Sequence, residues 1–209
     1  MKFYDCKTAP SPRRVRVFLA EKGIELTTVQ VDLGSGEQFG EAFRKINPDC
    51  VVPVLELDNG HCITEVVAIC AYLEELYPEP PLFGRSAVER AKATMWDHIV
   101  EIEGLLALAE ALRNTGEFFE DRALPGPDDT PQIPALVPRG KLRAQRFFDR
   151  IDRQLQETPF MAGKEFSVAD ITLLVTTDVA KWVDVDALGG RAALSEWYAQ
   201  ISSRPSAAA

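Results

Sequence analysis

Two neighbouring segments in the first third of the chain carry groups suited to binding a small anionic peptide. Residues 51–55 (VVPVL) are typical of a strand, residues 58–60 form a tight turn, and a second strand leads into a helix opening at Glu65. Proline is tolerated at the start of a strand because it has no N–H that would have to pair with a neighbouring strand. The bond before a proline is also the one peptide bond for which the cis form has a low free-energy cost. A cis bond would turn the N–H and C=O of Val52 outward towards an extended peptide, while the helix start offers N–H groups to a carboxylate.

The elements that must position these groups follow from apolar spacing, prolines and glycines. We expect, in order, a strand at 2–4, a helix at 13–22 ended by Gly23, a strand at 26–31, a helix at 38–45, the hairpin and the helix from Glu65. This βαβαββα order is thioredoxin-like, with a right-handed βαβ unit followed by a hairpin and a covering helix.

The second half of the chain has a helical period. Residues 78–81 (PEPP) cannot continue a helix and predict a stiff linker. Helices are then expected over residues 86–117, 138–155, 168–182 and 192–202. Residues 124–131 (LPGPDDTP) are too rich in Pro and Asp for a helix and predict a mobile loop over a cleft. The fold class is therefore an α+β thioredoxin-like domain (1–80) followed by an all-α helical domain (86–209).

Net charge, apolar runs and cysteine spacing exclude several classes of protein. The chain has 209 residues, 46% of them apolar, and a net charge of −9, which argues against nucleic acid or an anionic membrane as its main partner. No secretory signal and no window of about 18 uninterrupted apolar residues is present, so we expect a cytoplasmic protein. The four cysteines show no metal-type spacing, so we expect free thiols and no metal; they are Cys6, Cys50, Cys62 and Cys70.

Several further residues have structural interpretations. Ser167 and Asp170 have capping-box spacing ahead of an apolar run and are expected to stabilise a helix start. Arg13 and Arg14 are expected to be solvated or to bridge the two domains. Four aromatic or imidazole side chains are expected to pack rather than to bind ligand: His61, Trp96, His98 and Trp182.

Nearly the whole chain resembles the soluble glutathione transferase family. The resemblance is carried by residues 2–4 (KFY), 14–24 (RVRVFLAEKGI), 52–53 (VP), Glu65, 71–73 (AYL) and 166–172 (FSVADIT). It implies a glutathione transferase fold, glutathione as cosubstrate, and a homodimer in which the first domain of one subunit meets the helical domain of the other. It also implies a hydrophobic electrophile or a disulfide as second substrate, bound against the helical domain.

The same resemblance implies which residues bind the tripeptide. Val52 would pair with the cysteinyl backbone, and Pro53 would hold that geometry. Glu65 and the N–H of Val66 would bind the γ-glutamyl end, and Gln38 would reach the glycyl carboxylate. Many family members have Ser or Thr in place of Val66, and the missing hydroxyl removes one hydrogen bond, roughly 1 kcal/mol or about fivefold in affinity.

The residue expected to donate a hydrogen bond to the glutathione thiolate departs from the common family pattern. The position that holds Ser or Cys in many classes falls on Ala9, and residues 9–12 (APSP) resemble the entrance of the Nu-type, disulfide-reductase-like branch, which has a threonine there. We therefore assign the catalytic hydroxyl to Ser11. The alternatives are that Ser11 only caps the first helix, or that Thr8 or Cys6 contacts the sulfur.

These features predict a glutathione transferase that activates the glutathione thiolate for attack on an electrophile or a disulfide. Disulfide reductase and peroxidase activities fit the same site, as do isomerase and dehalogenase activities. The alternative is a relative with weak or no catalysis that serves as a binding or regulatory protein, and Ala9 and Val66 motivate it.

Overall fold

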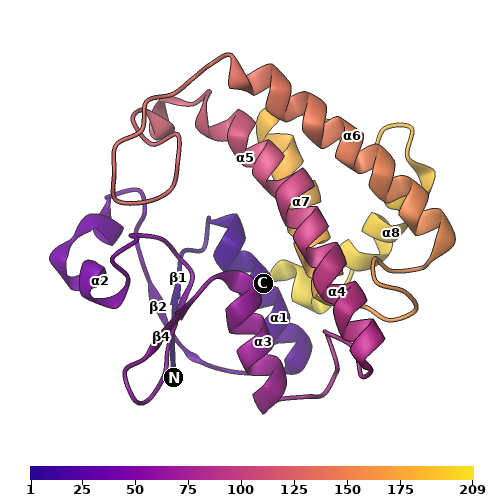
Figure 1. Cartoon of the computed structure of the whole chain (residues 1–209), viewed down its shortest axis with the longest axis horizontal. Helices are drawn as coiled ribbons and strands as arrows, with labels where there is room; N and C mark the ends of the chain where they lie inside the picture. Colours follow the sequence, from indigo (N-terminus) through magenta and orange to yellow (C-terminus); the bar gives the residue numbers. More distant parts are fainter.

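A four-stranded mixed sheet of order β2-β1-β3-β4 organises the first part of the chain in the computed structural model, which describes all 209 residues (Figure 1). Strand β1 pairs in parallel with β2 and antiparallel with β3, which pairs antiparallel with β4. The elements are β1 (Lys2–Asp5), α1 (Pro10–Lys22), β2 (Thr27–Gln30), the 3-10 turn η1 (Glu37–Phe39), α2 (Glu41–Ile46), β3 (Val54–Glu56), β4 (Cys62–Thr64) and α3 (Val66–Leu76). The predicted thioredoxin-like βαβαββα order is confirmed.

Successive side chains of a strand point to opposite faces of the sheet. Both faces of this sheet carry apolar side chains, and helices pack on both. Phe3 and Leu55 point to one face, where they join a buried cluster with residues of α1 and α3. Tyr4 and Val54 point to the other face and pack with Phe43 of α2.

The rest of the chain is helical. Its elements are α4 (Ala87–Ile99), the π-helical segment η2 (Val100–Leu105), α5 (Leu106–Arg113), η3 (Glu117–Phe119), α6 (Leu136–Glu157), α7 (Val168–Ala180), η4 (Lys181–Val183), α8 (Ala192–Ser202) and η5 (Pro205–Ala208). Nearly every residue of α7 is buried, because this helix packs against α4 on one side and against α1 of the thioredoxin-like domain on another. None of the helices combines the length and the mean hydropathy that a membrane-spanning helix requires.

Several predicted boundaries were wrong. The single helix predicted over 38–45 is the 3-10 turn η1 followed, after an extended Gly40, by α2. Helix α1 begins at Pro10 rather than at 13, since a proline in the first turn has no N–H to leave unpaired. Strand β3 begins only at Val54, so residues 51–53 lie outside it. The helix predicted over 86–117 consists of α4, η2 and α5 in succession and ends at Arg113.

The predictions for the cysteines, for the loop at residues 124–131 and for Trp96 are confirmed, and those for three other side chains were wrong. The cysteines are free, as predicted, and residues 124–131 form a loop. Trp96 packs against the helical core. The packing prediction was wrong for His61, His98 and Trp182, which are exposed; side-chain type alone does not show which face of an element points to solvent.

Asp170 has the structural role that its capping spacing predicted. Its carboxylate accepts hydrogen bonds from the N–H and hydroxyl of Ser167, from the N–H of Met161 and from Nε1 of Trp197. Burial raises the pKa of Asp170 to about 6, although these four hydrogen bonds oppose the rise. The residue ties the start of α7 to α8 inside the helical core.

Ion pairs join the two halves of the molecule, and of the two expectations for Arg13 and Arg14, solvated or bridging, the bridging one holds for both. Arg13 Nη1 lies 2.8 Å from Asp178 Oδ2 on α7. Arg14 Nη2 lies 2.8 Å from Glu101 Oε1 in η2. Helix α1, which carries both arginines, is therefore held in a defined position against the helical domain.

Candidate functional site

Strand register brings the predicted binding residues to one edge of the sheet. Val54 pairs with Tyr4 of β1 and with Thr64 of β4. The residues just beyond these pairs, Pro53 before β3 and Glu65 after β4, therefore face each other at the edge where β1 ends. The loop from β1 to α1 leaves from the same edge, so the start of α1 lies beside them.

Val52 presents unpaired backbone groups at this edge. The Val52–Pro53 peptide bond is cis, as predicted. Neither the N–H nor the C=O of Val52 has a hydrogen-bond partner in the chain. The side chain packs against the cluster of Val31, Phe43 and Val54, so the residue is anchored while its polar groups stay available. Such a free donor and acceptor pair can bind an extended peptide as a strand edge does.

Glu65 occupies a strained position at the start of α3. It is the N-cap residue, with φ 67° and ψ 128°, and its side chain makes no capping hydrogen bond. A non-glycine residue held at positive φ costs on the order of 1–3 kcal/mol, and such strain clusters at functional sites. The carboxylate is exposed, and the first N–H groups of α3 have no side-chain acceptor. Val66 follows with its side chain buried in the sheet core.

Ser11 lies in the first turn of α1, at the same edge. The N-cap residue of this helix is Ala9, which has no side-chain hydrogen bond to offer, so the alternative in which Ser11 caps the helix was wrong. The Ser11 side chain is half-buried, and its hydroxyl makes no hydrogen bond. It is a free donor near the positive end of a helix dipole.

The two alternative donors are less available. Cys6 is buried, and its Sγ lies 3.4 Å from Oγ1 of Thr8, which is exposed. Arg16 contacts the carbonyl oxygens of Cys6 and Lys7 at 3.3 and 3.0 Å and holds this turn in place. Both alternative groups are therefore engaged with each other, whereas Ser11 is not.

Gln38 lies in η1, next to a contact that sequence reasoning missed. It is only 9% exposed, and its side-chain amide makes no hydrogen bond. Arg122 of the helical domain stacks on the ring of the following residue, Phe39, at 4.2 Å. No spacing or periodicity marks a single arginine in a loop rich in Pro and Asp, so only the tertiary structure reveals this contact.

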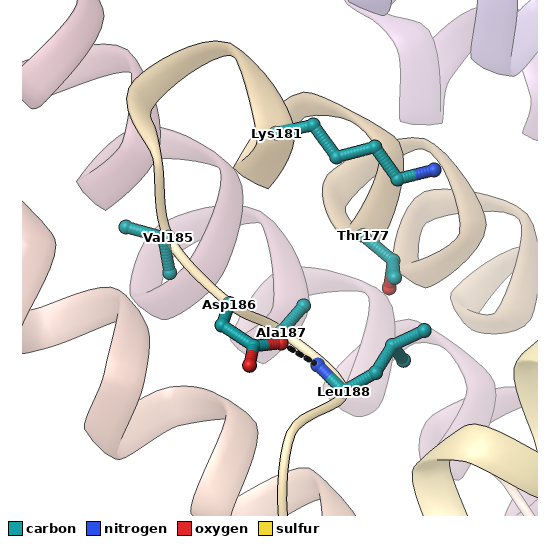
Figure 2. Close-up of a pocket in the computed structure, with 6 residues that line it drawn as sticks. All are labelled: Thr177, Lys181, Val185, Asp186, Ala187 and Leu188. Atoms are coloured by element: carbon teal, nitrogen blue, oxygen red, sulfur yellow. Dashed lines mark hydrogen bonds between the residues drawn. The ribbon is translucent and has the colours of Figure 1, made fainter.

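A small hollow in the helical domain lies elsewhere. It has a volume of about 140 Å³, and Figure 2 shows Asp186 in its wall, turned towards the N–H of Leu188. Its lining belongs to the helical domain alone: Thr177, Lys181, Val185, Asp186, Ala187 and Leu188. Hydrogen bonds from the N–H groups of Gly189 and Leu188 hold the pKa of Asp186 below its usual range, so this carboxylate organises a turn. None of the predicted binding residues lines the cavity.

A second, more open hollow of about 310 Å³ is lined by Met1, Leu57, Asp58, Asn59, Tyr72 and Leu76. It lies at the hairpin turn, away from the edge where Val52 and Glu65 meet. The candidate site is therefore described by its backbone groups, the free N–H and C=O of Val52 and the uncapped start of α3.

Family models match both parts of the chain. The model described as "Glutathione S-transferase, N-terminal domain" matches residues 8–76, and "Glutathione S-transferase, C-terminal domain" matches residues 140–209. Among curated proteins, Glutathione S-transferase 2 of Saccharomyces cerevisiae is 32% identical over 99% of this chain and 87% of its own length. The disulfide-bond oxidoreductase YfcG of Escherichia coli is 28% identical over 96% of this chain and 91% of its own length.

Solved structures agree with these matches. A glutathione S-transferase domain-containing protein of Marinobacter aquaeolei superposes with a TM-score of 0.91 at 37% identity, covering 99% of each chain. Gtt2 of Saccharomyces cerevisiae superposes with a TM-score of 0.89 at 32% identity, covering 99% of this chain and 98% of its own. The matches span both the sheet and the helical part, and the chain therefore belongs to the glutathione S-transferase family.

Proposed function

We propose that this protein is a glutathione transferase that binds glutathione at the sheet edge and uses its thiolate to attack an electrophile or a disulfide. The observation that carries the proposal is the unpaired N–H and C=O of Val52 beside the uncapped, strained helix start at Glu65. A tripeptide with carboxylates at both ends and a backbone in the middle complements this arrangement.

Each end of the tripeptide has a complementary group. The cysteinyl N–H and C=O would pair with those of Val52, which the Pro53 bond holds in place. The γ-glutamyl carboxylate would accept hydrogen bonds from the N–H groups that open α3, including that of Val66, and its ammonium group would pair with Glu65. Gln38 would contact the glycyl carboxylate.

Ser11 would supply the hydrogen bond that stabilises the thiolate. A thiol with a pKa near 8.5 is only a few per cent ionised at neutral pH. Lowering that pKa by about two units takes roughly 2.7 kcal/mol, which one charge-assisted hydrogen bond plus a helix N-terminus can provide. Ser11 has a free hydroxyl in the first turn of α1, which meets both requirements.

The thiolate chemistry is nucleophilic displacement. The sulfur would attack an electrophilic carbon and expel its leaving group, or attack a disulfide sulfur to give a mixed disulfide and release a thiolate. The similarity to YfcG, named as a disulfide-bond oxidoreductase, supports the second reaction, and the similarity to proteins named glutathione S-transferase supports the first.

The roles of the two domains and the assembly into a homodimer belong to the same proposal. Residues 1–80 would form the glutathione-binding domain, and residues 86–209 would contribute the site for a hydrophobic second substrate. The protein would work as a cytoplasmic homodimer. Sedimentation at micromolar concentration tests the assembly, and a monomer there would contradict it.

A catalytically weak binding protein is the second candidate. The absence of a hydroxyl at the N-cap of α1, where Ala9 lies, favours it. Calorimetry with glutathione and turnover assays with a generic aryl halide and a glutathione mixed disulfide separate the two. We expect both binding and turnover. Binding without turnover would favour the second candidate, and the absence of both would refute the glutathione site itself.

A further inference from the structure

Arg113 is a partly buried cation without a carboxylate partner. It is the last residue of α5, its side chain donates no hydrogen bond, and its Nε is buried. Burial lowers the pKa of the guanidinium, and no neighbouring charge opposes that effect. Every other arginine that is at least partly buried donates a hydrogen bond or pairs with a carboxylate. The missing partner is therefore specific to this position.

A series of contacts connects Arg113 to the thioredoxin-like domain. Its guanidinium carbon lies 4.8 Å from the centre of the Phe119 ring. The carbonyl of Phe119 accepts a hydrogen bond from the N–H of Arg122 at 2.9 Å, and Arg122 stacks on Phe39 of η1. In Figure 1 the segment between α5 and α6 extends towards the side of the molecule where α2 lies. Arg113 thus lies at the end of the helical domain that meets the sheet domain beside Gln38.

Hydrogen bonds to the backbone fix the end of α5. Gln132 Nε2 donates to the carbonyls of Arg113 and Gly116 at 2.9 and 2.8 Å. Asn114 Oδ1 accepts a hydrogen bond from the N–H of Ile133 at 2.7 Å. These neutral groups hold the arginine in place without neutralising its charge. A helix C-terminus and an aromatic ring both favour a cation, but neither provides the buried Nε with an acceptor.

An apolar surface lies next to this cation. The rings of Phe118 and Phe119 pack edge to face with their centres 4.9 Å apart, and Phe118 is 65% exposed. A carboxylate can accept two parallel N–H groups of a guanidinium, and such pairing offsets the free-energy cost of a partly buried charge. The guanidinium and the rings together complement a small organic anion with an apolar body.

We infer that Arg113 binds a negatively charged group of the second substrate, so that the protein prefers a disulfide or an electrophile that carries a carboxylate on an apolar body. This assignment rests on the proposed function and names a substrate class for it. A net charge of −9 repels anions in general, so a preference for one requires a local cation. Arg113 takes part in no bond change and acts through substrate binding.

Two disulfides that differ in charge test the assignment. Dithiodipropionate has a carboxylate at each end, and hydroxyethyl disulfide has hydroxyls in their place. The glutathione thiolate attacks one sulfur of either compound and the other sulfur leaves as a thiolate; a second glutathione thiolate then attacks the mixed disulfide, which gives oxidised glutathione and releases the remaining half as a thiolate. Formation of oxidised glutathione gives kcat/KM, which is divided by the rate constant of the uncatalysed exchange. Chloronitrobenzoate and chloronitrobenzamide are the equivalent pair for transfer to carbon.

The expected result is a change in the ratio of the corrected values for the charged and the neutral substrate. The parent protein should favour the charged one. Arg113→Met should lower the ratio about 10- to 100-fold, as expected for the loss of a charge-assisted contact. Arg113→Lys keeps the charge but loses the planar group, so it should keep most of the preference, within about fivefold of the parent.

Arg150→Met is the matched control. Arg150 lies over the ring of Trp96 at 5.4 Å, as Arg113 lies over a ring, but it also pairs with Glu103 at 2.6 Å. Its replacement should leave the ratio unchanged. Calorimetry with glutathione checks that the tripeptide site stays intact in all three variants.

Three results would overturn the assignment. They are a parent protein that favours the neutral substrate, a ratio that Arg113→Met leaves unchanged, and an equal fall in the turnover of both substrates in that variant. The first result needs no substitution, so it decides even where Arg113→Met fails to fold. A parent protein that binds no glutathione and turns over neither disulfides nor aryl halides would instead refute the proposed function.

Discussion

Thr172 donates its hydroxyl to Asp97 Oδ1 at 2.5 Å, a buried contact that joins α7 to α4. Burial raises the pKa of Asp97 to about 6, while the nearby Arg14 guanidinium and the Thr172 hydroxyl oppose the rise. Glu101 and His98 also face this carboxyl, the first raising and the second lowering its pKa. Ionising Asp97 inside the folded protein therefore carries a free-energy cost.

Asp97→Asn should change the pH dependence of stability. With the pKa raised from 3.8 to about 6, Asp97 stabilises the fold fully below pH 3.8, and this contribution of about 3 kcal/mol is lost as pH rises through 6. Asn keeps an oxygen for Thr172 but does not ionise. Urea unfolding from pH 4 to pH 8 should show the variant gaining stability relative to the parent as pH rises. A difference independent of pH would contradict this assignment.

The ion pair between Arg204 and Glu21 should give the free energy of unfolding the opposite pH dependence, with more stability at high pH than at low pH. Burial alone would raise the pKa of Glu21, but hydrogen bonds from Arg204 and Ser206 hold it below its ordinary value. This stabilisation is present above about pH 4.5 and is lost as pH falls through the lower folded-state pKa. Arg204→Met should lower the free energy of unfolding by about 2 kcal/mol at pH 7 and by much less at pH 3.

Arg85→Met is the control for that variant. Arg85 pairs with Glu79 where both side chains are more than half exposed, and such pairs contribute about 0–1 kcal/mol. Denaturation curves for the two variants at pH 7 should therefore differ clearly. Equal effects would mean that the Arg204 contact with α1 adds no more than a surface ion pair.

Gly140→Ala should destabilise the protein even though alanine favours helices. A Cβ at this position in α6 would lie 2.6 Å from the carbonyl oxygen of Ala107 in α5, a backbone atom that cannot move aside. Overpacking of this kind costs about 1–3 kcal/mol. Gly116→Ala, whose nearest neighbour would be 3.9 Å away, is the control and should stay within about 0.5 kcal/mol of the parent. Thermal and urea unfolding measure both.

Ser11→Ala should reduce turnover without reducing glutathione affinity. Loss of one charge-assisted hydrogen bond to the thiolate predicts a fall in kcat/KM of about 10- to 100-fold and a higher pKa of the bound thiol in the pH–rate profile. Thr8→Val and Cys6→Ala should behave as the parent does. Should one of these lose activity while Ser11→Ala keeps it, the donor would be reassigned to that residue.

Val66→Thr should strengthen glutathione binding. Threonine has nearly the shape of valine and restores a hydroxyl at the start of α3, where one hydrogen bond is worth roughly 1 kcal/mol or about fivefold in affinity. Because the Val66 side chain is buried, some loss of stability should accompany the gain. Calorimetry that shows equal or weaker binding would mean that a hydroxyl here points away from the ligand.

Much of the molecule followed from local sequence signals. The strand and helix order, the stop of α1 at Gly23, the bounds of α8 and the capping role of Asp170 were all predicted, since each depends on short-range patterns of apolar, capping or turn residues. Element boundaries that depend on packing, such as the first residue of β3, were predicted less well.

The sequence by itself determined the element order, because apolar spacing, caps and turn residues are local signals, and it determined the family, because several short motifs occur in a fixed order along the chain. Only the tertiary structure decided that Ala9 caps α1, that Val52 keeps its polar groups free, and that Arg122 stacks on Phe39. Contacts between segments about 80 residues apart depend on how two domains pack, and no local pattern encodes that geometry.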